Sequence, residues 1–367
     1  MTELGTHFSN RFKLGERAIG IGEPAFIIAE VSQNHCGDVD LAKKHVDAAK
    51  NAGCDCVKFQ TFTAEEMCAD REKLFTYWSQ GKEVTETEFE LHKRYEFDEN
   101  QWKEIVTYCD EVGIPFMTTV QDPVNLDVML RVGINAIKVG SDDFDHLRNF
   151  TAYAKANLPI ITSKGMADLA DVDRTIRHMR GITDKLVVMH CVSIYPAAAS
   201  DLNLRQIKTL SDLYPDVIWG FSDHSMGTLA ATSAVALGAK VIEKHFTLDH
   251  DLPGPDHWFS LDPKEMKDMV QSIRFVETAL GSGDVMPAPG EIEERKIRRR
   301  RIVVKKDIGA GERLTEENVS FKRALSGLFV QDWDNIVDAV AKHDLVKDQT
   351  VHLSDLNFLP DKNDPSG

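Results

Sequence analysis

The sequence predicts an α/β protein in which a (β/α)8 TIM barrel precedes a small C-terminal domain. Two observations lead to this prediction. Eight short apolar segments alternate with segments of helical period over roughly 250 residues, which is the length and rhythm of such a barrel. After residue 285, prolines and a basic run interrupt the pattern. The alternative, an open doubly wound sheet, usually has a glycine-rich first turn, which residues 32–38 lack.

The eight predicted strands are short apolar runs of the length expected for barrel strands. They are residues 26–31, 56–60, 115–119, 136–140, 159–163, 186–191, 217–222 and 240–245. Helices are predicted between them, among others at 38–52, 201–213, 227–237 and 262–280. In the first of these, Leu41, Val46 and Ala49 fall near a helical period, and Gly53 ends it.

One long insertion, residues 61–97, separates the second strand from the next helix. It is rich in Glu and Thr and carries Tyr77, Trp78 and Tyr95. Loops of this length within a compact domain usually have a function. We therefore interpret it as a long strand-to-helix loop, with a potential role as a mobile lid over the barrel mouth.

The domain boundaries follow from the change in composition. Residues 1–285 form the predicted barrel domain. Residues 286–301 form a predicted linker, whose basic run at 295–301 we interpret as a solvated or interdomain face. Residues 302–367 contain little helical pattern and form the predicted small domain.

The bulk composition limits the class of function. The chain has 367 residues and a formal net charge of −16, which argues against nucleic-acid binding but allows a small anion in a lysine-lined cleft. None of the six cysteines forms a CxxC pair, so free thiols in a reducing compartment are expected. The sequence has neither a secretory signal nor an apolar run of membrane-spanning length, and we expect a cytoplasmic protein that does not bind membranes.

Polar side chains gather where the predicted strands end, which is where barrel enzymes carry their chemistry. Any one of them has an ordinary explanation, such as a snorkelling lysine or a loop histidine, but eight successive strands with this ending favour a site. The residues at these ends include Glu30, Asn34, His35, Lys58, Gln60, Thr119, Lys138, Ser141, Ser163, Lys164, His190, Ser193, Tyr195, Ser222, His224, Glu243 and His245.

The residue types at these ends indicate an anion site beside a metal site. Three lysines (58, 138 and 164) with the hydroxyls of Thr119, Ser141 and Ser222 suit a phosphate or carboxylate. His224 and His245 suit a divalent metal ion that keeps positions open for substrate. After the last strand, the proline-rich loop 251–256 could hold Asp256 over the mouth to bind substrate hydroxyls.

Two mechanisms fit these residues, and a non-enzymatic role is a third possibility. One is metal-assisted carbon–carbon bond formation between a phosphorylated enol and an aldehyde. The other is a class I aldolase acting on pyruvate, in which Lys138 or Lys164 forms a Schiff base. The histidine pair favours the first. A carbohydrate-binding scaffold is disfavoured because it would not need buried charges such as Lys58.

The motifs resemble those of the bacterial sialic acid synthases, the N-acetylneuraminate synthase family that also makes legionaminic and pseudaminic acids. The matching segments span nearly the whole predicted barrel, and they are residues 28–37, 57–61, 138–141, 190–196, 220–224, 243–247 and 253–256. The C-terminal domain resembles the small antifreeze-like domain of this family, a β-clip also called the SAF domain.

The resemblance implies that phosphoenolpyruvate condenses with an open-chain N-acyl amino sugar and that phosphate is released. The sugar would be N-acetylmannosamine or a diacetamido-trideoxy hexose. The related enzymes that use N-acetylmannosamine 6-phosphate are the alternative, and the Pro-Gly-Pro-Asp loop at 253–256 favours the unphosphorylated type. The resemblance also implies a divalent metal, Mn or Mg, at His224 and His245.

Further site roles come from the matching positions. Phosphoenolpyruvate would be held by Lys58, Thr119, Lys138, Ser141 and Ser222. The residues that would face the sugar and the reacting centre are Glu30, Gln60, Tyr195, Glu243 and Asp256. The residues expected to be catalytic are Glu30, Glu243, His224 and His245.

The resemblance implies a domain-swapped homodimer, in which Arg323 of one subunit reaches the sugar in the other. The chain departs from the family pattern at three places. Lys164 replaces a threonine, Ser193 replaces an asparagine that would contact phosphate, and Ala-Leu-Ser-Gly follows Arg323 in place of Pro-Gly.

Overall fold

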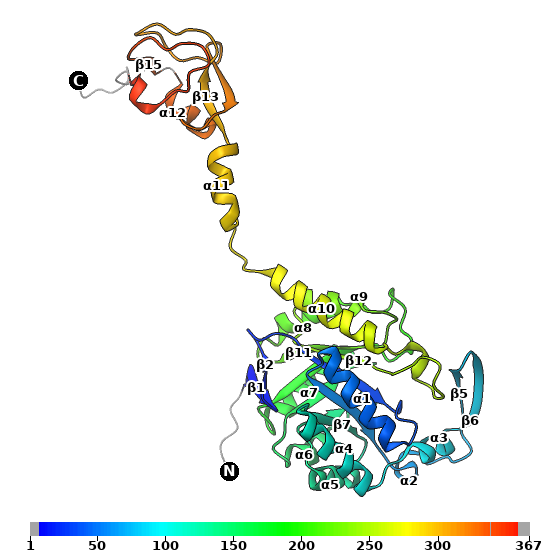
Figure 1. The fold of residues 1–367 in the computed structure, drawn as a ribbon. Helices are drawn as coiled ribbons and strands as arrows, with labels where there is room; N and C mark the ends of the chain where they lie inside the picture. Colours follow the sequence, from blue (N-terminus) through cyan, green and yellow to red (C-terminus); the bar gives the residue numbers. More distant parts are fainter. Residues whose placement is uncertain (1–6, 338, 359–367) are drawn as a thin grey trace. The chain divides into compact units, whose positions relative to one another are not determined.

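The computed structural model describes residues 7–337 and 339–358, and the chain divides into two compact units, Met1–Gly281 and Ser282–Gly367. The first unit contains a closed barrel of eight parallel strands, so the predicted TIM barrel is confirmed (Figure 1). Within the described part of the chain, no helix is long and apolar enough to cross a membrane.

The barrel strands follow one another around the ring in chain order, and the last pairs with the first. They are β3 (Phe26–Ser32), β4 (Cys56–Thr61), β7 (Phe116–Val120), β8 (Ile137–Val139), β9 (Ile160–Ser163), β10 (Leu186–Cys191), β11 (Ile218–Asp223) and β12 (Val241–His245). All eight lie within a residue or two of their predicted bounds.

Helices cover the outside of the barrel between successive strands. They are α1 (Val39–Ala52), α4 (Glu99–Val112), α5 (Pro123–Val132), α6 (Leu147–Ala154), α7 (Leu169–Arg180), α8 (Arg205–Leu213), α9 (Leu229–Ala236) and α10 (Pro263–Leu280). Aspartate N-caps begin several of them, including Asp38 and Asp98, whose carboxylates accept the otherwise unpaired first amide protons. Gly53 ends α1 in the left-handed conformation at φ 89°.

The interior of the barrel changes from apolar to polar along each strand. Alternate residues of a strand face the same side, so Phe26, Ile28 and Glu30 share the inner face of β3. The first two belong to a buried apolar cluster inside the barrel, and Glu30 follows them toward the carboxyl end. The hairpin of β1 (Arg11–Leu14) and β2 (Arg17–Gly20) adds apolar side chains to this cluster. The strand pattern did not predict this hairpin.

The insertion at 61–97 is not a loop, and this expectation was wrong. It contains α2 (Ala64–Met67), the antiparallel pair β5 (Leu74–Ser79) and β6 (Lys82–Thr87), and α3 (Glu88–Tyr95). The β5–β6 hairpin projects beside α3 (Figure 1). Gln80 and Gly81 make its turn, and both have positive φ (51° and 74°), which is the turn geometry that matches the twist of paired strands.

The second unit contains α11 (Pro289–Arg298), the pair β13 (Arg300–Val304) and β14 (Val319–Arg323), and shorter elements α12 (Trp333–Ile336), β15 (Val340–Ala341) and β16 (Leu356–Asn357). Helix α11 occupies most of the segment expected to be a linker. The basic run is not solvated throughout. Arg301 is buried, lies 3.4 Å from the ring centre of Phe329 and donates a hydrogen bond to the carbonyl of Gly327 at 2.9 Å.

Candidate active site

A cavity of about 690 Å³ lies at the carboxyl ends of the barrel strands, and we call it the inner cavity. Its lining brings together residues from all eight strands or the loops that follow them. The predicted site residues in this lining are Glu30, Lys58, Gln60, Thr119, Lys138, Ser141, Ser193, Tyr195, Ser222, His224, Glu243 and His245.

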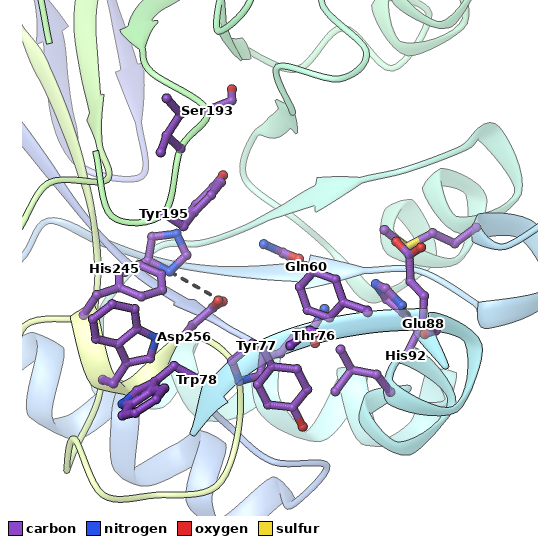
Figure 2. A pocket seen from close by; sticks show the side chains of 18 residues that line it. Gln60, Thr76, Tyr77, Trp78, Glu88, His92, Ser193, Tyr195, His245 and Asp256 are labelled. Atoms are coloured by element: carbon purple, nitrogen blue, oxygen red, sulfur yellow. Dashed lines mark hydrogen bonds and ion pairs between the residues drawn. The ribbon is translucent and has the colours of Figure 1, made fainter. Parts of the chain in front are cut away.

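A second cavity of about 680 Å³, which we call the outer cavity, shares six lining residues with the inner one: Gln60, Met67, Glu88, Ser193, Tyr195 and His245. The predicted site residue Asp256 lines it. In Figure 2, Ser193 and Tyr195 lie above this cavity, and the hairpin residues Thr76, Tyr77 and Trp78 lie below it. The two cavities are therefore neighbouring compartments of one site.

Lys58 is at the centre of a buried polar network in the inner cavity. Its Nζ lies 2.8 Å from Glu30 Oε2 and 3.7 Å from Glu243 Oε1, and donates to Thr119 Oγ1 at 2.9 Å. Ser222 donates to Glu243 at 3.0 Å. The residues come from five strands (β3, β4, β7, β11 and β12), and the strand register explains why they meet, since Glu30 is level with Lys58 and Ser222 is level with Glu243.

The two carboxyl groups of this network differ in acidity. Burial raises the pKa of Glu30 to about 7, although Lys58 opposes the shift. Burial also raises the pKa of Glu243, but Lys138 and Lys58 lower it more, so that it ends below its usual value. Burial lowers the pKa of Lys58, and the two carboxylates raise it above its usual value. Near neutral pH, Glu243 is thus ionised while Glu30 can hold a proton.

Lys138 and a set of hydroxyls also line the inner cavity. Burial lowers the pKa of Lys138, whose Nζ donates to the carbonyl of Val139 at 2.9 Å. The hydroxyl of Ser141 accepts from the backbone amide of Gly165 at 3.0 Å. A Cβ atom at Gly165 would collide with the hydroxyls of Ser141 and Ser193, so glycine is required for this close approach.

The two predicted metal ligands lie side by side at the boundary between the cavities. The ring centres of His224 and His245 are 5.5 Å apart, and Tyr195 packs on His224 at 4.0 Å. Asp256 Oδ2 lies 3.6 Å from His245 Nδ1 and accepts a hydrogen bond from Ser32 Oγ at 2.6 Å. A β-bulge at the end of β3 gives Ser32 a positive φ of 53° next to this contact.

The donor set fits a divalent ion. His224 Nδ1 lies 2.8 Å from the carbonyl of Val192, which fixes the proton on Nδ1 and leaves the lone pair of Nε2 available. His245 Nδ1 is buried without a hydrogen-bond partner. Burial lowers the pKa of His245 well below its usual value and favours the neutral ring that metals bind. For His224 burial acts in the same direction, but Cys191 and the Val192 carbonyl raise its pKa more.

Within the described residues, a different group has three ligand atoms close enough together to hold a metal ion: His250, Asp262 and Glu265. None of these three residues lines either cavity. Asp262 and Glu265 form the capping box of α10, in which each side chain accepts a hydrogen bond from the other's backbone amide (2.8 and 3.0 Å). These contacts account for the proximity of the two carboxylates.

Several strand-end residues lie outside the site. His35 is buried among Phe59, Phe97 and Trp102, and burial lowers its pKa to about 3. Lys164 was expected at the mouth as a third lysine, but its Nζ donates to Gln206 at 2.6 Å and it lines a separate hollow beside α7.

Two further residues of the strand ends have structural partners. His190 Nε2 contacts the carbonyl of Leu202 at 2.6 Å, and Asn34 donates to the carbonyl of Phe246 at 2.9 Å. Arg323 is exposed at the end of β14 in the other unit.

The sequence reasoning missed residues on both cavities. Ser163 was noted at its strand end but was not assigned to the site, although it lines the inner cavity with a buried Oγ that has no partner. Gln121 and Cys191 also line the inner cavity, and Phe75 and Trp258 the outer one. The hairpin residues had a detectable signal in the aromatic and β-branched run at 74–79, which precedes a glycine-containing turn.

Comparison with known proteins gives a consistent result. Residues 45–285 match the model of the NeuB family, and residues 299–357 match the SAF domain. The chain is 38% identical over 334 residues to an N,N'-diacetyllegionaminic acid synthase of Legionella pneumophila, covering 90% of this chain and 94% of that protein. It is 35% identical to an N-acetylneuraminate-9-phosphate synthase of Mus musculus, covering 83% of this chain and 85% of that protein.

A solved structure is also similar, that of an N-acetylneuraminic acid (sialic acid) synthetase from Leptospira borgpetersenii in complex with citrate. It superposes with a TM-score of 0.71 at 32% identity, and the match covers 80% of this chain and 97% of that one.

Proposed function

The chain belongs to the NeuB family of sialic and related nonulosonic acid synthases, and from this premise we propose that it condenses phosphoenolpyruvate with an open-chain N-acyl amino sugar and releases phosphate. The family resemblance predicted from the motifs is confirmed, as is the SAF domain. The sugar is N-acetylmannosamine or a diacetamido-trideoxy hexose. The relatives carry different substrate names, so the sugar has to be argued from the site.

One observation carries this proposal. The inner cavity combines buried lysines and hydroxyls with two carboxyl groups, and the pKa values of these two groups shift in opposite directions. Lys58, Lys138 and the hydroxyls of Thr119, Ser141 and Ser222 supply donors for a phosphate and a carboxylate. Ser163, whose hydroxyl is buried without a partner, adds another donor. Lys58, Lys138, Ser163 and Ser222 are buried, and preorganised donors of this kind bind an anion more strongly than donors in solvent do.

The reaction forms one carbon–carbon bond, and the carbon–oxygen bond from C2 to phosphate is replaced by one from C2 to the oxygen of water. C3 of phosphoenolpyruvate attacks the aldehyde carbon of the sugar, and the aldehyde oxygen takes up a proton. Water adds to the electron-poor C2 and loses a proton, and the C2–O bond to phosphate breaks as the 2-keto group forms. The products are a 2-keto acid with three more carbons than the sugar, and inorganic phosphate.

The two carboxyl groups suit the two proton transfers. Glu30, with its pKa near 7, holds a proton that it can donate to the aldehyde oxygen. Glu243 is ionised and can accept a proton from the attacking water, and its Oε2 is buried without a hydrogen-bond partner. Gln60, which donates to Glu30 Oε1 at 3.2 Å, helps to hold that carboxyl group in position.

His224 and His245 would hold a divalent ion, Mn or Mg, and a bound ion would supply Lewis-acid polarisation of the aldehyde. Tyr195 packs on both imidazole rings and limits their movement. Asp256, fixed by Ser32, would accept a hydrogen bond from a sugar hydroxyl, and Ser193 would contact phosphate. In the domain-swapped homodimer that we propose, Arg323 of the partner subunit contacts the N-acyl group.

A Schiff-base aldolase is the second candidate, because burial lowers the pKa of Lys138 and so favours a nucleophilic amine. Lys164 is a poorer candidate, since its amino group lies on Gln206 outside the inner cavity. Borohydride reduction in the presence of pyruvate separates the two mechanisms. A covalent adduct on Lys138 would support the aldolase, whereas the synthase forms none.

The direct test measures phosphate release from phosphoenolpyruvate with N-acetylmannosamine, its 6-phosphate and a diacetamido-trideoxy hexose, each with and without added Mn²⁺. We expect release only when a sugar and the metal ion are both present. Absence of release with all three sugars would refute the proposed function.

A further inference from the structure

The outer cavity differs in character from the inner one. Its walls include the apolar side chains of Met67, Phe75, Trp78, Leu91, Trp258 and Phe259, which come from the 61–97 insertion and from the segment after β12. Among the described residues that line it there is no lysine or arginine, and its carboxylates are Glu88 and Asp256. The outer cavity is therefore a largely apolar compartment, next to an inner cavity that is lined by three lysines, four carboxyl groups and several hydroxyls.

The position of the outer cavity defines what enters it. In the proposed reaction, phosphoenolpyruvate occupies the inner cavity, where Lys58 and Lys138 lie, and the aldehyde end of the sugar reacts near His245, at the boundary. The shared lining residues make the outer cavity the continuation of that space. The rest of an open-chain sugar, from the carbon after the N-acyl group to the far end, therefore extends into the outer cavity.

The hairpin wall of the outer cavity is held in place by hydrogen bonds of its side chains. The amide of Gly254 donates to Ser79 Oγ at 3.1 Å, and Gln80 Nε2 donates to the carbonyl of Asp251 at 3.0 Å. Across the hairpin, the hydroxyls of Thr76 and Thr85 are 2.8 Å apart. The contacts of Ser79 and Gln80 join the hairpin to the loop that carries Asp256.

Two aromatic side chains of this wall are left uncovered. Trp78 is 44% exposed and Phe75 is 39% exposed, although both line the cavity. Large aromatic surfaces stabilise a complex mainly when an apolar group covers them. A sugar hydroxymethyl group would gain little from this contact, while a methyl group or the methyl of an acylamido substituent would gain more.

The charges of the outer cavity act against an anionic sugar. A phosphate at the far end would face Asp256, and the described residues that line the outer cavity include no lysine or arginine. Glu88 lies 2.7 Å from Lys73, so these two charges are already paired with each other. An uncharged far end avoids this cost.

We propose that the outer cavity selects an uncharged amino sugar with apolar substituents at its far end, a diacetamido-trideoxy hexose, and that Trp78 and Phe75 are the residues that determine this specificity. This inference rests on the proposed synthase function and narrows its substrate class. The preference is for the trideoxy sugar over N-acetylmannosamine, and for both over the 6-phosphate.

The test compares kcat/KM for the three sugars at saturating phosphoenolpyruvate and metal. We expect the trideoxy sugar to be favoured over N-acetylmannosamine by about tenfold or more, which is the discrimination that one or two apolar groups supply. We expect the 6-phosphate to be the poorest substrate. If the 6-phosphate or N-acetylmannosamine were the best substrate, this inference would be overturned and the synthase function would stand. If no sugar were turned over, the synthase function itself would be overturned.

Substitutions in the hairpin test whether Trp78 causes the preference for the trideoxy sugar. Trp78→Ala is expected to lower kcat/KM for the trideoxy sugar about tenfold with little change for N-acetylmannosamine, while Trp78→Phe keeps most of the preference. Leu74→Ala is the matched control, since Leu74 is in the same strand and 67% exposed but does not line the cavity. An equal loss for both sugars in Trp78→Ala, or the same loss of preference in Leu74→Ala, would overturn the assignment of Trp78.

Discussion

A buried ion pair behind the candidate metal ligands offers the sharpest test of how the site is held together. Asp223 and Lys244 are level with each other on β11 and β12, and each precedes one of the histidines by a single residue. Lys244 Nζ lies 2.9 Å from Asp223 Oδ2, and the two side chains are 1% and 0% exposed, respectively. Asp223 Oδ1 also accepts from the amide and hydroxyl of Ser225 at 2.8 and 2.7 Å.

Replacing Lys244 with methionine leaves the aspartate charge buried without its cation. Removal of one partner from a buried pair costs about 3–5 kcal/mol, whereas replacement of both partners by uncharged groups is often close to neutral. We therefore expect Lys244→Met to lower the free energy of unfolding by about 3–5 kcal/mol. In the double variant Asp223→Asn/Lys244→Met, the asparagine oxygen can still accept from Ser225, and at least about 2 kcal/mol of this loss should be recovered.

Urea denaturation followed by far-UV circular dichroism gives the free energies, because the barrel contributes most of the helix signal. Lys208→Met is the control, since the Lys208–Asp212 pair is exposed on the surface of α8, and no measurable change is expected there. The reasoning would be refuted if Lys244→Met cost less than about 1 kcal/mol. A double variant no more stable than the single one would also refute it.

Three further predictions concern the chemistry of the site. Because the pKa of Glu30 is raised to about 7, Glu30 gains a negative charge above that pH, beside an anionic substrate. The KM for phosphoenolpyruvate should therefore rise as the pH increases through this value. An equal rise of the KM in the Glu30→Gln variant would contradict the assignment. His224→Ala and His245→Ala should each abolish metal-dependent phosphate release and leave the circular dichroism spectrum unchanged, while His250→Ala should remain active. If only His250→Ala were inactive, the metal site would have to be assigned to the group at the α10 capping box instead. Lys138→Met should lower kcat/KM for phosphoenolpyruvate by about 100-fold or more, since it removes a charged donor from the anion site. Lys164→Met should change kcat/KM less than about threefold, because Lys164 bonds to Gln206 instead. Similar losses in both variants would show that Lys164 reaches the inner cavity.

Much of the barrel could be predicted because the decisive signals are local. A strand buried on both faces is a short apolar run, and its end is marked by the first polar side chains, as in Ile28 and Glu30 of β3. The polar ends of all parallel strands meet at one mouth once the barrel closes, so listing them predicted most of the inner cavity.

The errors in the site have a common physical cause. Sequence gives the position of a residue along its strand, but the direction of a side chain after the strand ends depends on the turn. His35 and Lys164 both follow a strand closely, yet one packs among aromatic rings outside the barrel and the other bonds to Gln206. The residues at regular inward positions, such as Lys58 and Glu243, were placed correctly because strand alternation fixes their direction.

The sequence by itself determined the barrel, the residue types at its mouth and the family to which the chain belongs, because alternation within strands and closely spaced motifs are properties of short segments. Only the tertiary structure decided that the 61–97 insertion forms a hairpin, and that Trp78 and Phe75 meet Asp256 around a second, apolar cavity. Those residues are far apart in the chain, and what joins them is the contact of Ser79 with Gly254, which no local pattern encodes. The acidity of Glu30 likewise depends on burial and on Lys58, which the fold brings to within 2.8 Å.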